Sequence, residues 1–424
     1  MQIREKYASV ERAIARVRDC FADAPEIGET FACCISDTLQ RTIHPREDGL
    51  VDVITGDIPA MWLRDSACQL SPFIRLSREE PELLALLTAL SRRHAALILS
   101  DPYANAFNVG ENSSIWMSDD TDMKPFLWER KYEIDSLCHP VRMAWQLWQQ
   151  TGGAAHFTDE WHAAFREILR VFRTEQYHET RSDYRFQRAN SPWTDTLSRD
   201  GKGALVKEGV GLIWSGFRPS DDACVYGYLI PSNMQACVCL GHIAEIAKAI
   251  YHDDALADEA AAFSAEVRAA VERFAVVPMA DFYAYEVDGF GQFNIMDDAN
   301  LPSLLSMPYM GYCEKDDPLY LATRRMVLSS RNPFYYAGKC LKGIGSPHTP
   351  PDYVWDIALA MQGLTSQDRR EQLACIRAMV DNDAGTHLMH EGICVDDPTR
   401  YTRPWFSWAN SMFCELVMDY CGIR

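Results

Sequence analysis

The stretch WHAAFREILRVF, residues 161–172, carries the clearest structural signal in the chain. Its large apolar residues are spaced three or four apart: Trp161, Phe165, Ile168 and Phe172. In an α-helix this spacing puts all four on one side and leaves the charged residues on the other. The same one-sided pattern recurs at residues 7–21 and 263–274, so the sequence predicts several amphipathic helices.

Working outward, similar patterns predict further helices at residues 26–42, 80–98, 136–150, 234–250, 318–329, 353–363, 367–381 and 405–420. Ser77 with Glu80, and Thr365 with Asp368, resemble helix start signals. Strand signals are sparse, and residues 281–294 (DFYAYEVDGFGQFN) predict one small β-hairpin. We therefore expect an all-α fold. Because no Pro- or Ser-rich linker divides it, we expect residues 1–424 to form a single domain.

The composition argues against several classes of partner. The 424 residues carry a net charge of -19 without a compensating run of Lys and Arg, which disfavours nucleic acids and anionic membrane surfaces. The N-terminal stretch is charged throughout, and no later window suggests the apolar length of a membrane span, so we expect a cytoplasmic protein. The 14 Cys residues lack metal-site spacing and fit reduced core thiols. No pattern indicates an oligomeric state.

The segments that connect the predicted helices are unusually rich in aromatic and polar residues. They are residues 55–69, 128–140, 214–233, 296–311, 342–355 and 389–411. Aromatic side chains are costly to expose, and buried Arg, Asp and His need partners, so these segments do not fit solvated connectors. A toroid of helical pairs would bring all of them together at one end, as a shared site.

The aromatic residues of these connections fit carbohydrate binding. They are Trp62, Trp128, Trp214, Trp355, Trp405, Trp408, Tyr226, Tyr228, Tyr309 and Tyr353. Such side chains combine an apolar face, which packs against a sugar ring, with a polar edge. Each Trp taken alone is more typical of a core, and it is the coincidence with carboxylates that favours a site.

Hydrolysis of a glycosidic bond needs two carboxyl groups, one as acid and one as base or nucleophile. Asp221 and Asp222 are candidates for the acid, because two like charges in a partly desolvated loop raise the pKa of one. The alternative is that this stretch merely caps the following helix, a role that Ser220 can also fill. Both interpretations remain open from the local sequence.

Glu391 is the candidate base. His390, Arg400 and Arg403 lie close in sequence and are able to keep its carboxylate ionised. An exposed Glu paired with an Arg explains the same local sequence about equally well.

Metal-dependent chemistry has weaker support. Asp297 and Asp298 with His348, or His387 with His390, supply ligand types, but no third ligand follows at a recognisable interval. Phosphate loops, nucleophile elbows and dinucleotide fingerprints do not occur. We therefore expect neither a metal nor a cofactor.

Long motifs in these connections identify a family. They include TGDIPAMWLRDS (55–66), DPYANAFN (101–108), WERKYEIDSLC (128–138), WSGFRPSDDAC (214–224), KGIGSPHTP (342–350) and MHEG (389–392). In this order the sequence resembles glycoside hydrolase family 125, the exo-acting α-1,6-mannosidases. Residues 109–123 and 312–317 depart from the pattern. The resemblance implies an (α/α)6 toroid that removes non-reducing terminal mannose from α-mannoside oligosaccharides, with inversion and without metal.

Carried over by position, the resemblance implies that Asp221 is the general acid and Glu391 the general base. Asp222 then becomes a structural partner within the site. The residues expected to bind the terminal mannose are Arg64, Asp65, Asn300, His348 and Arg403. Two alternatives remain: a carbohydrate-binding protein without catalysis, and a metal-dependent glycosidase or lyase on the same toroid.

Overall fold

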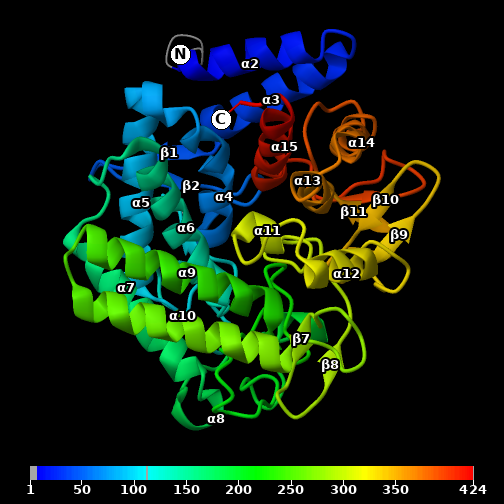
Figure 1. Ribbon diagram of the computed structural model, residues 1–424. Coiled ribbons are helices and arrows are strands. Elements are labelled where there is room, and N and C mark those ends of the chain that lie inside the picture. The colour runs from blue at the N-terminus through cyan, green and yellow to red at the C-terminus, as the bar shows by residue number, and fades with distance from the viewer. Residues whose placement is uncertain (1–6, 111–112, 424) are drawn as a thin grey trace.

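The computed structural model describes residues 7–110 and 113–423, and it is mostly helical with small sheets (Figure 1). The helices are α2 (Ala8–Cys20), α3 (Pro25–Arg41), α4 (Leu63–Ile74), α5 (Pro81–Ser100), α6 (Ile134–Thr151), α7 (Asp159–Glu175), α8 (His178–Arg181), α9 (Ile230–Ala249), α10 (Asp254–Phe274), α11 (Met307–Met310), α12 (Pro318–Val327), α13 (Asp356–Leu364), α14 (Arg369–Val380) and α15 (Ser407–Tyr420). Each predicted helix is confirmed; most ends shift by a few residues, and α10 begins nine residues before the predicted position 263.

The strands are short and antiparallel. They are β1 (Ile43–Pro45) with β2 (Val51–Val53); β3 (Ala60–Trp62), β4 (Ala106–Asn108) and β5 (Leu127–Glu129); β6 (Tyr228–Leu229), β7 (Glu286–Val287) and β8 (Phe293–Asn294); β9 (Tyr335–Ala337) with β10 (Lys342–Ile344); and β11 (Tyr353–Trp355) with β12 (Gly392–Cys394). The predicted hairpin at 281–294 is confirmed as β7–β8, and β6 extends it to three strands.

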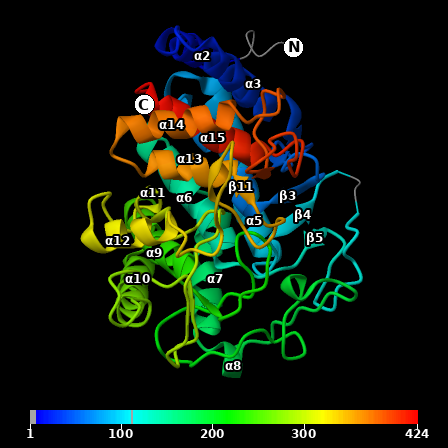
Figure 2. The same cartoon turned by 90° about the vertical axis from the view of Figure 1, so that its right-hand side faces the viewer.

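The helices divide into an inner and an outer set. Inner helix α4 packs against α6 and α15, α6 packs against α9, and α13 packs against α15. Outer helices cover them: α10 lies beside α9, α14 beside α13, and α3 beside α15 (Figures 1 and 2). Every residue of α4 is buried. Leu63, Ala67, Leu70 and Phe73 follow the helical spacing of three and four, but residues 63–69 fall in the predicted connection 55–69, so α4 was not among the predicted helices.

Three inner helices begin directly after a strand. Helix α4 follows β3, α9 follows β6, and α13 follows β11. This order corrects the prediction of a helix over 353–363, since residues 353–355 form β11 and the helix begins at Asp356. The strands thus lie where inner helices begin, and they position the connections that carry the predicted site residues.

The two predicted start signals are wrong in detail. Ser77 begins a short 3-10 turn, and α5 begins at Pro81, whose fixed backbone suits the first helical position. Thr365 ends α13, whereas Asp368 caps α14 by accepting a hydrogen bond from the Arg370 amide at 2.8 Å.

Helix α5 differs from the expectation that no window has the length and apolarity to cross a membrane. Over the described residues it is the one helix that meets both criteria. Leu83, Leu87 and Leu90 are nevertheless buried, and α5 packs against α7 and α6. Length and composition alone fit a core helix equally well.

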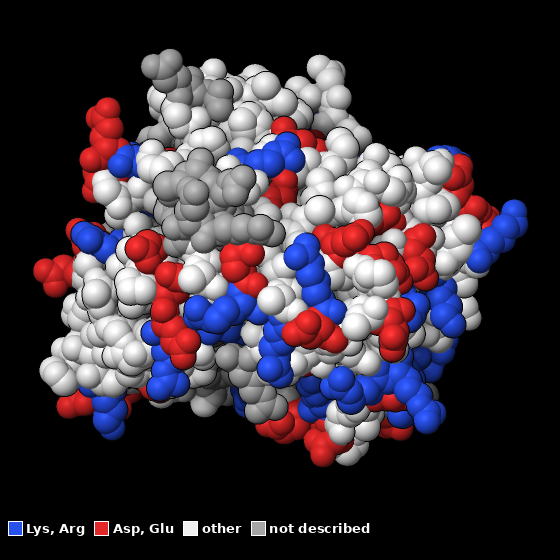
Figure 3. All heavy atoms as spheres, turned by 90° about the horizontal axis from the view of Figure 1, so that it is seen from above, with Lys and Arg blue, Asp and Glu red and all other residues white. Residues whose placement is uncertain are grey.

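On the face seen in Figure 3, acidic and basic side chains are interspersed rather than separated into one basic surface.

Candidate active site

The connections enclose a cavity of about 140 Å³. Its lining residues come from widely separated parts of the chain: Thr55, Ile58, Trp62, Arg64, Asp65, Pro219, Ser220, Asp221, Asn300, His348, Trp355, Glu391, Arg403, Phe406 and Trp408. Every predicted site residue except Asp222 is among them. The structure therefore brings both candidate catalytic carboxyls to one small cavity.

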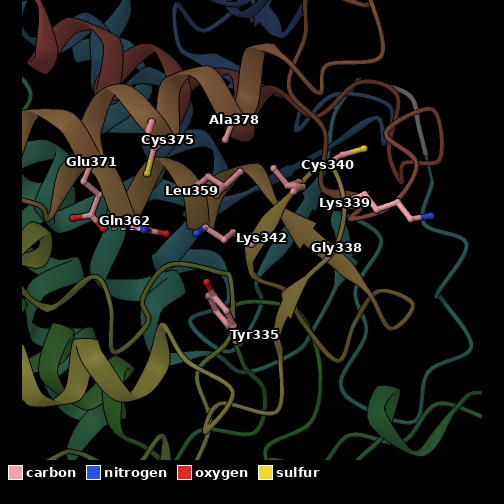
Figure 4. Close-up of a pocket in the computed structure, with 12 residues that line it drawn as sticks. Tyr335, Gly338, Lys339, Cys340, Lys342, Leu359, Gln362, Glu371, Cys375 and Ala378 are labelled. Atoms are coloured by element: carbon pink, nitrogen blue, oxygen red, sulfur yellow. Dashed lines mark hydrogen bonds between the residues drawn. The ribbon is translucent and has the colours of Figure 1, made fainter.

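A larger cavity of about 320 Å³ lies elsewhere, between the β9–β10 hairpin and helices α13 and α14 (Figure 4). Its most prominent acid is Glu371, which accepts hydrogen bonds from Gln362 and Arg324. Neither Asp221 nor Glu391 lines this cavity. We therefore place the candidate chemistry in the smaller cavity.

Asp221 occupies a tight turn. Its amide donates to the Arg218 carbonyl at 2.9 Å, and its backbone has a φ of 69°, in the left-handed region that Asp enters only at a cost. The carboxyl accepts hydrogen bonds from Asn105 Nδ2 at 3.2 Å and Arg64 Nη2 at 3.5 Å. Since 24% of the side chain is exposed, Asp221 reaches the cavity while staying anchored from behind.

Behind Asp221, Arg64 binds several buried carboxyls. Its Nη1 donates to Glu133 Oε2 at 2.6 Å and to Asp135 Oδ2 at 3.0 Å, and its Nε lies 3.5 Å from Asp65 Oδ1. Burial raises the pKa of Glu133 well above its usual value, and it also raises those of Asp135 and Asp65. Because several carboxyl groups surround one guanidinium, their mutual repulsion favours keeping a proton on some of these carboxyls.

The expected electrostatic partnership of Asp221 and Asp222 is wrong. Burial alone would raise the pKa of Asp221, but Arg64, Lys131 and a hydrogen bond with Glu133 outweigh it and lower the pKa to about 2. The left-handed turn separates the two neighbours, because Asp222 faces His348 instead. The group with the raised pKa beside Asp221 is Glu133.

Asp222 is buried beneath the cavity lining and binds His348. The distance between His348 Nδ1 and Asp222 Oδ1 is 3.0 Å, and Asp222 Oδ2 finds no partner among the described residues. Burial opposes the charged imidazole, but Asp222, Glu391 and Asp221 outweigh burial and raise the pKa of His348 to about 9. His348 therefore carries a positive charge into the cavity at neutral pH, where both catalytic candidates act on it.

Glu391 directly precedes β12, and the pairing of Gly392 with Trp355 on β11 brings it to the cavity wall. Burial raises the pKa of Glu391, although His348 and Arg403 act to lower it. The expected help from His390 is not observed, because that imidazole contacts the Arg403 carbonyl and stacks on Tyr401. His348, from a distant segment, acts on Glu391 together with the predicted Arg403.

Neighbouring residues hold the remaining predicted residues in place. Thr55 donates to Asp65 Oδ2 at 2.5 Å, and Arg403 Nε donates to Asp57 Oδ1 at 2.8 Å. Asn300 lines the cavity and donates to Asp298 at 3.2 Å. Arg64 and Asp65 are buried in the cavity wall. Their surroundings therefore fix the orientation of the polar atoms that they present to a bound molecule.

The aromatic prediction holds in part. Trp62, Trp355 and Trp408 line the cavity. Trp214 and Trp405 do not line the cavity: Trp214 stacks on Tyr132 and His178, and Trp405 donates to Asp37. These two are structural residues, which the local sequence does not distinguish from sugar-contacting ones.

Several residues were not singled out from the sequence. Asn105, Lys131 and Glu133 contact Asp221, and the motifs DPYANAFN and WERKYEIDSLC already contained them. Within the divergent stretch 109–123, Asp119 pairs with Arg188 at 2.6 Å, which makes it a structural residue. Among the described residues, no group of three or more His, Cys, Asp or Glu is placed to hold a metal ion.

Comparison with known proteins finds relatives along nearly the whole chain. The family model for metal-independent alpha-mannosidases of family GH125 matches residues 24–418. The chain is 37% identical to the meiotically up-regulated gene 157 protein of Schizosaccharomyces pombe, over 97% of this chain and 85% of that protein.

Among solved structures, a Streptococcus pneumoniae metal-independent α-mannosidase in a non-productive complex with α-1,6-mannobiose is 45% identical. Its TM-score is 0.96, and the match covers 98% of this chain and 99% of that one. A bacterial glucoamylase in complex with acarbose shares the fold at 12% identity, with a TM-score of 0.59 over 96% of this chain and 57% of that one. A Saccharomycopsis fibuligera glucoamylase does so at 11% identity, with a TM-score of 0.57 over 94% and 95%. The chain belongs to glycoside hydrolase family 125, the metal-independent alpha-mannosidases.

Proposed function

We propose that this chain is an exo-acting, inverting α-1,6-mannosidase that removes non-reducing terminal mannose from α-mannoside oligosaccharides. The observation that carries the proposal is that Asp221 and Glu391 line one small cavity together. Membership of the α-mannosidase family supports the sugar and the bond, and the α-1,6-mannobiose bound to the 45% identical pneumococcal protein supports the linkage.

The exo mode follows from the size of the cavity. At about 140 Å³ it is smaller than the roughly 300–1,000 Å³ of pockets that enclose drug-sized ligands, and it suits one sugar ring rather than a chain. Trp62, Trp355 and Trp408 offer apolar surfaces for the ring, while Arg64, Asp65 and neighbouring groups offer hydrogen bonds to its hydroxyls.

In the proposed mechanism Asp221 protonates the glycosidic oxygen, and Glu391 removes a proton from a water that attacks the anomeric carbon from the opposite face. Inversion needs room for that water, so we expect the two carboxyl groups to lie about 6.5–9.5 Å apart. The His348 cation favours the ionised form of Glu391, which the base requires.

We also infer that the helices form an (α/α)6 toroid and that residues 1–424 are a single domain. The chain of inner contacts from α9 through α6, α4 and α15 to α13, each with outer helices, supports this arrangement. The shared fold with glucoamylases supports it as well.

The test is hydrolysis of α-1,6-mannobiose followed by proton NMR. We expect the mannose released first to be the β-anomer, because inversion of an α-linkage produces it. Initial release of α-mannose contradicts inversion. Faster cleavage of α-1,2- or α-1,3-mannobiose contradicts the proposed linkage.

A further inference from the structure

We propose that Glu133 is a positioning residue for the reaction: it shares one proton with Asp221 and supplies it when a glycosidic oxygen enters the cavity. The inference rests on the proposed role of Asp221 as the general acid. It adds a residue whose carboxyl acts through Asp221 rather than on the sugar.

The geometry places both carboxyls on the same guanidinium. Arg64 Nη1 donates to Glu133 Oε2 at 2.6 Å, and Arg64 Nη2 donates to Asp221 Oδ1 at 3.5 Å. Asp135 and Asp65 are ion-paired with the same Arg64, at 3.0 and 3.5 Å. Four carboxyls therefore surround one cation.

Neighbouring cations do not balance this charge. Lys131, the next cation, donates to the Asp221 carbonyl at 2.8 Å but is already paired with Asp195 and Glu129. His348 is paired with Asp222. Because uncompensated charge is costly to bury, the cluster is expected to retain a proton on at least one carboxyl.

Two of the four carboxyls, Glu133 and Asp65, have an oxygen that is buried without a donor among the described residues, and of these two we assign the proton to Glu133, which adjoins Asp221. Glu133 Oε2 accepts from Arg64 and from Ser136 at 2.7 Å, whereas Oε1 is buried without a donor. Arg64 holds the Glu133 and Asp221 carboxyls next to each other through Nη1 and Nη2, and a hydrogen bond between two carboxyl groups requires a proton on one of them. Asp135 is less suited to retain the proton, because Arg64 and Ser232 already donate hydrogen bonds to its two oxygens.

The proton transfers balance over one turnover. The shared proton moves from Glu133 to Asp221 as Asp221 gives a proton to the departing oxygen, so the pair ends with one proton fewer. The attacking water forms the new C–O bond and gives its proton to Glu391. Solvent then removes that proton from Glu391 and restores one to the pair.

The experiment compares wild type, Glu133→Gln and the control Asp135→Asn, which also removes a buried carboxyl from Arg64. Each is assayed across pH on α-1,6-mannobiose and on α-mannosyl fluoride, whose leaving group departs with little help from an acid. In Glu133→Gln we expect kcat on mannobiose to fall by about 10²–10⁴-fold, the range of general-acid catalysis. We expect the alkaline limb of its kcat/KM profile to move toward lower pH. The rate of fluoride hydrolysis should stay within about tenfold of the wild-type rate, because this substrate gains little of the rate factor that general-acid catalysis provides.

The control separates proton sharing from structural support. Asp135→Asn should keep the ratio of the two activities close to that of wild type. Equal losses on both substrates in Glu133→Gln, or an unmoved pH profile, overturn the role of Glu133. If wild type cleaves the fluoride but not mannobiose, the proposed function fails, and this inference fails with it.

Discussion

The pairing of His348 with Asp222 predicts a specific pH dependence of stability. The perturbation is His348→Asn, because the Asn amide can donate to Asp222 in place of Nδ1 but does not titrate. The pKa of His348 is raised to about 9 from an ordinary value of 6.5. A group with a raised pKa stabilises the folded state fully below 6.5, and this contribution is lost as the pH rises through 9.

The magnitude follows from that difference. The difference between the two pKa values corresponds to about 3.4 kcal/mol of stabilisation of the folded state. Because 37% of the His348 side chain is exposed, solvent screening reduces this to the order of 1.5 kcal/mol. For a chain of this length, such a change shifts Tm by about 2 °C.

Differential scanning calorimetry of wild type and His348→Asn between pH 6.5 and 9.5 measures the effect. We expect the Tm of wild type to fall relative to that of the variant by about 2 °C, with most of the change between pH 7 and 9. A difference between the two Tm values that does not change over this range refutes the assigned pairing. So does a difference that changes in the opposite direction.

Four further predictions concern the catalytic groups and their support. Asp221→Asn should lower kcat on α-1,6-mannobiose by about 10²–10⁴-fold while leaving the circular dichroism spectrum unchanged; wild-type turnover rejects its role. Glu391→Ala should lose hydrolysis but form β-mannosyl azide from α-mannosyl fluoride when azide is added, and an α-azide product detected by NMR contradicts inversion. Arg64→Met should lower the free energy of unfolding in urea by about 3–5 kcal/mol, because Glu133 and Asp135 lose their buried cation; a loss below about 1 kcal/mol contradicts that pairing. Incubation with EDTA followed by dialysis should leave kcat/KM on mannobiose unchanged, as membership of a metal-independent family implies, and a loss restored by a divalent cation contradicts it.

Local patterns in the sequence predict the outer helices well and the inner ones less well. Helix α7 shows a stripe because one face is exposed and the other is buried. Helix α4 shows helical spacing at Leu63, Ala67, Leu70 and Phe73, but its buried polar residues placed 55–69 in a connection, and Pro72 lowers its helix propensity. Short strands such as β3 and β11 escaped prediction for a related reason, since three residues are too few to show a period.

The candidate site was predictable by composition and motif but not in its electrostatics. Motifs identified Asp221 and Glu391 as chemically important, and the structure places both at one cavity. The adjacent aspartates looked like a coupled pair, yet the left-handed backbone of Asp221 directs it to Arg64 and leaves Asp222 to His348. Contacts between residues so far apart in the chain depend on the folded arrangement, which no local pattern encodes.

The cavity wall also includes Phe406 and Trp408, which lie at the start of α15, and α15 packs against α3 and α4 from the opposite end of the sequence. During translation, Arg64 and Asp221 leave the ribosome long before these aromatic residues do. A nascent chain therefore has no complete sugar pocket until α15 has emerged and docked, and mannose should bind only after that step.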